Sequence, residues 1–515
     1  MPESERRNVN QYLRKAEQEL RGYRTEVNRL KTMITVLEYK ERTLKEKMAN
    51  YRSLLSPVHR LPPEILTQIF ELCAGEEPLL SPDRNPAIVS LTQVCGRWRQ
   101  TALSVPQLWC CVSLVLGIEW FMNVGGTIPS WRKLNHLGFM AELFTERSKT
   151  APLSLVLRTC PESQIPNAQL DQALAAIACL LGNSKRWHRF ECSHDLLSRP
   201  SFANIRDRLS NLARLTIDSF IGARPAQTIF ANCPSLTDLD IKPDHWNEAN
   251  FPLHQINSLR LTTSYVNTAR PILQRCTNVR RLELENIGSY NRPDDSEQII
   301  LPRVECLRIT ATEEEDLSDI INLLTLSSLV QLEIRRSVDE SSWWNFNLGP
   351  LRDFLLRSSC TITSLDLYRV PISDNETLSL LRLMPTLRTL SVQEYGTLAT
   401  VPVKRIVTPT FLAPFRASQH TDEIFLPSLK DLSFTFYHSE VIQQALVDVV
   451  ASRVPDVRES ITTGPVAWLT SFNLTIMAKE ADKVDISVLS APLECFGAVG
   501  ISISVSLKVI PPEDD

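Results

Sequence analysis

Residues able to catalyse a reaction or hold a cofactor are scattered through this chain of 515 residues. Its eight histidines are dispersed, and the sequence has no G-x-x-x-x-G-K loop, G-x-S-x-G elbow or H-E-x-x-H pair. Such spacings matter because phosphate binding, nucleophilic attack and zinc hydrolysis each need their groups at fixed separations. We therefore expect no enzymatic activity and no catalytic, cofactor-binding or metal-binding residues.

The twelve cysteines include no C-x-x-C pair and no zinc-type spacing. Several, such as Cys179, stand among apolar residues, as small core side chains do in a reducing compartment. Residues 1–11 are polar and charged and lack the apolar segment of a signal peptide. The sequence predicts a location in the cytoplasm, the nucleus or both.

Charge and hydropathy limit the classes of partner. The 55 Lys and Arg residues are balanced by 59 Asp and Glu residues, so there is no basic excess to hold nucleic acid. No apolar run is long enough to span a bilayer. We expect neither nucleic acid nor membrane as a partner. The length of 515 residues exceeds one compact core and indicates several domains or a repeat array.

A short pattern, Leu-x-x-Leu-x-Leu or Ile, recurs between residues 187 and 474. Leu212-x-x-Leu215-x-Ile217 is one copy. Up to Leu390, central residues follow one another at 20 to 25 residues, with one interval of 33. This is the period of leucine-rich repeats, in which each unit is a strand followed by a return and buries its leucines on the next unit. The pattern predicts a leucine-rich-repeat solenoid.

Residues that alternate with these leucines should share one exposed, concave face of the sheet. Their mixed charges suit a folded or peptide partner and argue against a phosphate backbone. A plain solvated sheet face is the alternative. The candidates for a substrate surface are Asp218, Asp240, Lys242, Arg260, Glu283, Glu285, Arg308, Glu333, Arg335 and Tyr368. The run Trp343-Trp344-Asn345-Phe346 could grip a substrate, or cover the convex side or pack on a neighbouring repeat.

Residues 58–114 predict a second binding site. Pro62 and Pro63 suit the first turn of a helix, and Glu64 complements its positive end. The residues that follow are more apolar than one helical face requires, which indicates contact on two sides. A second helix near residues 88–103 is expected from the helical spacing of its apolar residues. Helices this short cannot bury a sufficient core alone and need a neighbour.

Three elements in this order resemble the F-box-like domain of large fungal families. They are Leu61-Pro62-x-Glu64-Ile65-Leu66-x-x-Ile69-Phe70, Val94-Cys95-x-x-Trp98-Arg99 and Pro106-x-Leu108-Trp109. The resemblance implies a helical module that docks on a Skp-family adaptor and, through it, on a cullin and a RING subunit. Irregular repeats like these also resemble those that follow F-boxes in receptor proteins. The adaptor-binding residues implied by the motif are Leu61, Pro62, Ile65, Leu66, Ile69, Val94, Cys95 and Trp98.

The function implied by this resemblance is substrate recognition in an SCF-type E3 ubiquitin ligase, with a target protein of unknown identity bound by the repeats. One alternative is that the apolar residues of the motif are the ordinary core of a larger helical domain. Another is a leucine-rich-repeat scaffold unconnected with ubiquitination, in which the F-box-like helices only cap the solenoid.

Residues 11–55 contain no proline and one glycine, Gly22, and their apolar residues recur at steps of three and four. Only Glu41 breaks this series. A repeat of about 3.5 residues is typical of a coiled coil. The helix therefore either pairs with a second copy, packs along its own domain, or stays isolated and only partly ordered.

The sequence thus predicts a mixed α and α/β protein with a long N-terminal helix, a small helical F-box module and a leucine-rich-repeat solenoid. The predicted boundaries are 1–56 for the helix or coiled coil, 57–115 for the F-box-like domain, 116–150 for a helical connector, 151–480 for the solenoid and 481–515 for a C-terminal cap and tail.

Overall fold

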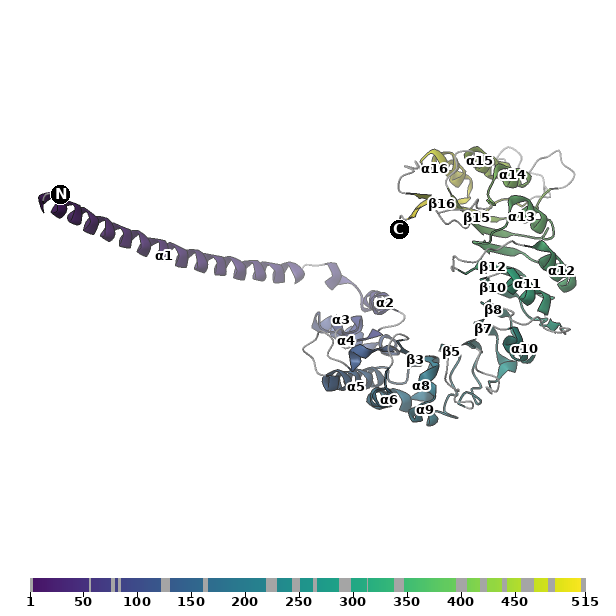
Figure 1. Ribbon diagram of the computed structural model, residues 1–515, viewed down its shortest axis with the longest axis horizontal. Helices are drawn as coiled ribbons and strands as arrows, with labels where there is room; N and C mark the ends of the chain where they lie inside the picture. The colour runs from purple at the N-terminus through teal and green to yellow at the C-terminus, as the bar shows by residue number, and fades with distance from the viewer. Residues whose placement is uncertain are drawn as a thin grey trace. The chain divides into compact units, whose positions relative to one another are not determined.

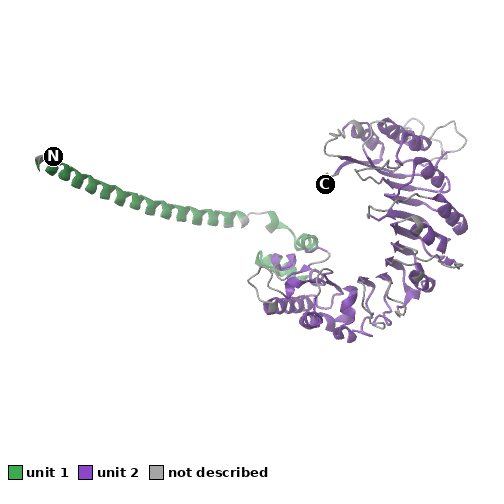
Figure 2. Ribbon diagram, viewed as in Figure 1, with its two compact units in different colours: residues 1–73, 91–105 green, residues 74–90, 106–515 purple. Residues whose placement is uncertain are grey.

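The chain divides into two compact units in a computed structural model (Figure 2). Unit 1 comprises residues 1–73 and 91–105, and unit 2 comprises residues 74–90 and 106–515. The predicted module at residues 57–115 is therefore divided between them. The structure describes residues 3–54, 57–75, 79–81, 85–121, 130–160, 165–218, 229–242, 251–262, 266–286, 298–312, 314–337, 347–394, 405–416, 424–437, 442–454, 467–479 and 487–510.

Unit 1 begins with the predicted long helix, which is confirmed as α1 (Glu3–Leu54) (Figure 1). Ion pairs one turn apart support it, such as that of 2.6 Å between Lys45 Nζ and Glu41 Oε1. A 3₁₀ turn, η1 (Pro57–Arg60), leads to α2 (Pro63–Ala74). The unit also contains α4 (Gly96–Ser104), whereas α3 (Ala87–Leu91) crosses the boundary between the units.

Unit 2 is built on one large parallel sheet. In the described part of the chain, fifteen strands form this sheet and pair in sequence order. Two further short strands form a separate pair. The strands of the large sheet are β1 (Leu79–Leu80), β2 (Cys111–Leu116), β3 (Leu153–Thr159), β4 (Trp187–Ser193), β5 (Arg214–Asp218), β6 (Asp238–Ile241), β7 (Ser258–Thr262), β8 (Arg281–Glu285), β10 (Cys306–Ala311), β12 (Gln331–Arg336), β13 (Ser364–Tyr368), β14 (Thr389–Gln393), β15 (Asp431–Tyr437), β16 (Ser471–Lys479) and β17 (Ser502–Ile510). The separate pair is β9 (Ile299–Ile300) with β11 (Leu324–Thr325).

The repeated leucines are in register across this sheet. Leu215 pairs with Leu239, Leu239 with Leu259, and the same position continues through every neighbouring strand to β17. All eleven copies of the sequence pattern include strand residues, on β4 to β8, β10 and β12 to β16. β1, β2, β3 and β17 extend the sheet beyond those copies.

Backbone hydrogen bonds reinforce this register where the strands begin. Thr237 N–H donates to the Ala213 carbonyl (3.0 Å), Asn257 N–H to Thr237 (2.8 Å) and Arg280 N–H to Asn257 (2.8 Å). The same bond recurs at each strand start from His188 to Ser502 without interruption. Each segment is thus bonded to the one before it, whatever the length of the chain between them.

Helices return the chain between many of the strands and lie along one face of the sheet (Figure 1). They bury the leucines that point to that face, including Leu282, Leu307 and Leu332. The helices of unit 2 are α5 (Ser130–Arg147), α6 (Asn167–Ala176), α7 (Ala178–Gly182), α8 (His194–Leu197), α9 (Pro200–Ala203), α10 (Val266–Arg275), α11 (Glu314–Leu323), α12 (Leu348–Ser358), α13 (Asp374–Leu381), α14 (Pro409–Leu412), α15 (Gln443–Ser452) and α16 (Ser487–Glu494).

A buried arginine holds the turn that precedes β15. Arg453 is fully buried at the end of α15 and donates to three main-chain carbonyls, those of Phe415 (2.7 Å), Phe425 (2.6 Å) and Leu426 (3.0 Å). Burial lowers the pKa of Arg453 to about 10, so the guanidinium is still protonated at neutral pH. Its charge-assisted bonds satisfy the carbonyls of Phe415 and Phe425, and add a second donor to that of Leu426, which also accepts from Leu429 N–H at 3.3 Å.

Replacement of this arginine should destabilise the sheet. We predict that Arg453→Met costs about 2–5 kcal/mol, because the buried carbonyl groups of Phe415 and Phe425 lose this donor and that of Leu426 keeps only the bond from Leu429 N–H. The cost is measurable as a lower midpoint of urea unfolding. Arg416→Met is the control, since Arg416 is about half exposed and pairs with Asp448 at the surface, where a pair contributes about 1 kcal/mol or less. Equal midpoints for the two variants would contradict this role of Arg453.

Candidate functional site

Helix α2 presents apolar side chains on two faces, as its composition indicated. Leu66 and Phe70 are fully buried. Ile65, Ile69 and Leu72 lie at i, i+4 and i+7 on another face, where Ile65 is 40% and Leu72 is 84% exposed. A buried face and an exposed apolar face on one short helix are what a docking helix requires.

Within unit 1, α4 is tied to both ends of α2. Arg97 Nη2 donates a hydrogen bond to the carbonyl oxygen of Leu61, just before α2 begins. The rings of Phe70 and Trp98 lie 5.1 Å apart with their planes at 58°. These contacts fix the direction of α2 and hold its apolar stripe in place.

The start of α4 carries two of the predicted residues. Cys95 is the N-cap, and its Sγ accepts a bond from Trp98 N–H at 3.5 Å. Its neighbour Val94 is 59% exposed. Cys95 therefore has a local role in starting the helix, while Val94 offers apolar surface.

The eight predicted adaptor residues thus differ in what they can contact. Pro62, Ile65 and Val94 are exposed, Leu61, Ile69, Cys95 and Trp98 are half-buried, and Leu66 has no exposed surface. Leu66 therefore supports the helix from inside. Leu72, which was not among the predicted contacts, is the most exposed apolar side chain of α2, and its spacing from Ile65 and Ile69 was the signal that could have identified it.

Residues 58–115 match the family model of the F-box-like domain. The chain contains an F-box-like domain. The exposed residues of α2 and the start of α4 belong to this domain, which confirms the resemblance read from its motifs. No curated protein matches the chain.

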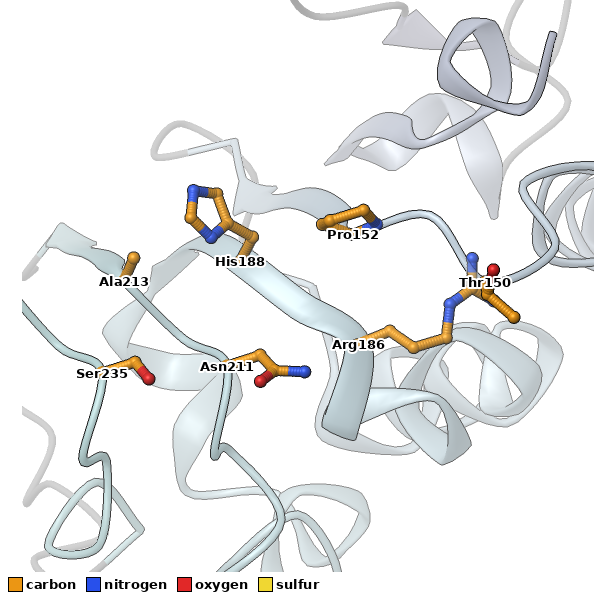
Figure 3. Close-up of a pocket in the computed structure, with 7 residues that line it drawn as sticks. All are labelled: Thr150, Pro152, Arg186, His188, Asn211, Ala213 and Ser235. Carbon is orange, nitrogen blue, oxygen red and sulfur yellow. The ribbon is translucent and has the colours of Figure 1, made fainter.

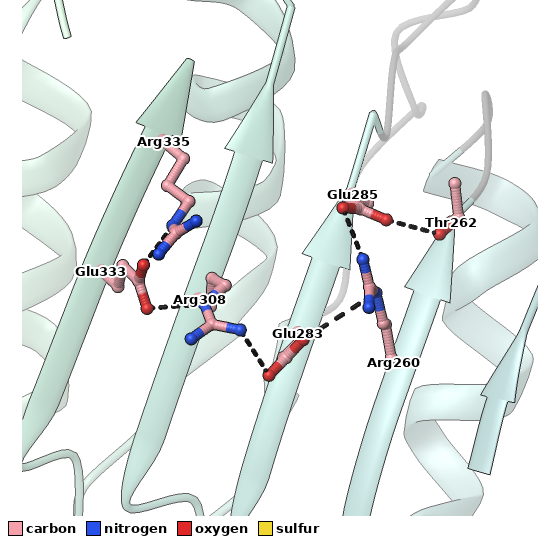
Figure 4. A network of polar contacts seen from close by, with 7 residues as sticks. All are labelled: Arg260, Thr262, Glu283, Glu285, Arg308, Glu333 and Arg335. Carbon is pink, nitrogen blue, oxygen red and sulfur yellow. Dashed lines mark hydrogen bonds and ion pairs between the residues drawn. The ribbon is translucent and has the colours of Figure 1, made fainter. Parts of the chain in front are cut away.

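The charged residues predicted as a substrate surface form a network on unit 2 (Figure 4). Arg308 lies between two carboxylates, with Nη1 2.8 Å from Glu283 Oε1 and Nε 2.5 Å from Glu333 Oε2. Arg335 pairs with the other oxygen of Glu333. Glu333 is buried, so this carboxylate is held by the two arginines rather than by water.

The network continues on the neighbouring strands. Arg260 Nη2 lies 2.8 Å from Glu285 Oε1, and Thr262 Oγ1 donates to Glu285 Oε2 at 2.9 Å. At the ends of β5 and β6, Lys242 Nζ, one residue after β6, lies 2.5 Å from Asp218 Oδ1. The predicted surface residues of these strands are therefore largely paired within the chain.

Tyr368 lies at the far side of this network, with the guanidinium of Arg335 5.0 Å from its ring centre. The structure thus brings Arg260, Glu283, Glu285, Arg308, Glu333, Arg335 and Tyr368 together, with Asp218 and Lys242 as a separate pair. The aromatic run at residues 343–346 lies outside the described residues.

Asp240 is the exception to this pairing. It is in register with Arg260, yet burial, together with Glu285, Glu191 and Glu283, raises the pKa of its carboxyl to about 6. Arg260 opposes this shift without cancelling it. Asp240 is therefore a carboxyl group whose negative charge is only partly offset by Arg260, on a face where the neighbouring charges form ion pairs.

A shallow hollow of about 440 Å³ lies where β3 to β6 begin (Figure 3). Three of its polar side chains bond within the chain: Arg186 Nη2 donates to the Ala151 carbonyl (2.9 Å), Asn211 Nδ2 to Lys185 (2.9 Å) and the Ser235 hydroxyl to Ser210 (2.8 Å). These bonds join neighbouring turns. The hollow therefore contributes to the packing of the strand starts.

Within the described ranges, no three His, Cys, Asp or Glu residues gather closely enough to hold a metal ion. None of the described helices combines the length and hydropathy needed to cross a bilayer.

The raised pKa of Asp240 predicts a pH-dependent stability. An acid with a higher pKa in the folded than in the unfolded chain destabilises the fold above the folded pKa, and this cost disappears as pH falls toward the unfolded value near 3.9. Asp240→Asn should therefore raise the free energy of unfolding at pH 7.5 by on the order of 1–2 kcal/mol, measured as a higher thermal midpoint, and this gain should shrink at pH 5.

Asp353→Asn, which removes an exposed carboxylate from α12, controls for the change in net charge. An equal gain from Asp240→Asn at both pH values, or none at pH 7.5, would contradict the role assigned to Asp240.

Proposed function

We propose that this protein is the substrate-recognition subunit of an SCF-type E3 ubiquitin ligase. F-box domains generally bind Skp-type adaptors, and residues 58–115 form an F-box-like domain. The observation that carries the proposal is the apolar stripe of α2, in which Ile65 and Leu72 are exposed and Ile69 is half-buried, together with the exposed Val94 of the same domain. The adaptor would connect the chain to a cullin and a RING subunit.

In this proposal, unit 2 is a leucine-rich-repeat solenoid that binds the target protein through the charged sheet face. Parallel strands in sequence order, leucines in register and the unbroken bonds at the strand starts support it. The ion pairs hold the side chains of this face in fixed positions, so a protein partner would meet a preorganised surface. The chain itself would perform no catalysis and would act in the cytoplasm, the nucleus or both.

The test is retention of the full chain by an immobilised Skp-type adaptor. Ile65→Asp/Leu72→Asp places two charges on the exposed stripe, where substitution costs the fold little. We expect retention to fall at least tenfold, as for the loss of a central apolar contact. Leu66→Asp is unsuitable because Leu66 is fully buried.

Leu356→Asp is the matched control, since Leu356 on α12 is 62% exposed and lies outside the F-box-like domain. Circular dichroism of each variant verifies folding. A folded native chain that does not bind the adaptor would overturn the proposal and leave a repeat scaffold unconnected with ubiquitination. Equal retention of the native chain and Ile65→Asp/Leu72→Asp would show that this stripe is not the docking surface.

A further inference from the structure

Helix α1 carries a row of largely exposed apolar residues along its length, which only Glu41 interrupts. Val9, Leu20, Val27, Ile34 and Leu44 are each between 45% and 59% exposed. In heptad notation the row consists of positions a (Leu13, Leu20, Val27, Ile34, Glu41 and Met48) and d (Val9, Ala16, Tyr23, Leu30, Leu37, Leu44 and Tyr51). It covers about six heptads, which is more than the three to four that characterise a coiled coil.

The charges beside the row are segregated along the helix. At position g, the N-terminal half has Glu19 and Glu26, whereas the C-terminal half has Lys40 and Lys47. Position e carries both signs in both halves, with Glu17, Arg24 and Lys31 followed by Glu38, Lys45 and Arg52. Because g and e residues flank the apolar row, they determine which orientation a partner helix takes.

We infer that α1 pairs with the α1 helix of a second copy of this chain in the antiparallel orientation. In an antiparallel pair g faces g, so the acidic half of one helix lies against the basic half of the other. Glu19 and Glu26 then face Lys40 and Lys47, and symmetry repeats each favourable contact. This charge complementarity identifies a second copy of α1 as the partner that covers the apolar row. The inference does not depend on the proposed ligase function.

A parallel pair in register lacks this advantage. There, g of one helix faces the e residue five positions later on the other. Glu19 with Arg24 and Glu26 with Lys31 attract, but Lys40 with Lys45 and Lys47 with Arg52 repel. Attraction in one half is cancelled by repulsion in the other.

Glu41 gives an independent reason for the same orientation. It is the one charged residue at an a position between Leu13 and Met48. A parallel pair would bring the two Glu41 carboxylates together between the helices, where like charges are desolvated. In an antiparallel pair, position a faces position d, so Glu41 lies opposite an uncharged residue of the N-terminal half and its pair with Lys45 can persist.

Charge reversal on the full-length chain separates the two orientations. Lys40→Glu/Lys47→Glu makes the charged g–g contacts of an antiparallel pair repulsive, but turns the repulsive g–e contacts of a parallel pair into attractive ones. We expect the native chain to be a dimer by sedimentation and light scattering, and the double variant to dimerise at least tenfold more weakly. Adding Glu19→Lys/Glu26→Lys to the double variant should restore the dimer.

Arg14→Glu/Arg42→Glu is the matched control, since it changes the net charge equally at two outward b positions. It should dimerise like the native chain. A native chain that is monomeric at micromolar concentration, or a Lys40→Glu/Lys47→Glu variant that dimerises more tightly, would overturn the inference. Circular dichroism of every variant verifies that α1 is still helical.

Discussion

Burial of leucines between neighbouring strands is the interaction on which unit 2 depends. Leu215, Leu239 and Leu259 occupy the same register on successive strands. A single strand could not bury its leucine away from water without its neighbours. Stacking in sequence order satisfies all of them at once. The bonds at the strand starts, such as Thr237 to Ala213, fix the spacing of this stack. Connections can then vary in length without shifting the sheet.

The same alternation places charged side chains together on the other face. Arg260, Glu283, Arg308 and Glu333 follow one another in register on β7, β8, β10 and β12, with alternating sign. Neighbours can therefore neutralise one another, and the arginines reach both carboxylates beside them. If the target protein binds this face, as we propose, the paired charges would select it by shape and hydrogen bonding more than by long-range attraction.

Periodicity predicted the central strands, but it missed those at the ends. β2 and β3 lack the first leucine of the pattern, because Trp109 and Pro152 stand in its place, and β17 has Gly500 there. These strands nevertheless align with their neighbours in the same register. Their alignment is set by backbone pairing with the adjacent strands, and their own sequences do not reveal it. The alternation of residues predicted which ones share a face, whereas the individual ion pairs depend on side-chain reach across the sheet. On α2, composition predicted two apolar faces but could not show that Leu66 is buried and Leu72 exposed.

We propose that the F-box-like domain docks on an adaptor through the exposed face of α2 and the start of α4. Amide hydrogen exchange of the full chain, with and without a Skp-type adaptor, tests this docking most directly. We expect slower exchange in residues 61–72 and 94–98 when the adaptor is present, and unchanged exchange in the strands from β5 to β16. Protection confined to the sheet, or unchanged exchange in both regions at saturating adaptor, would contradict it.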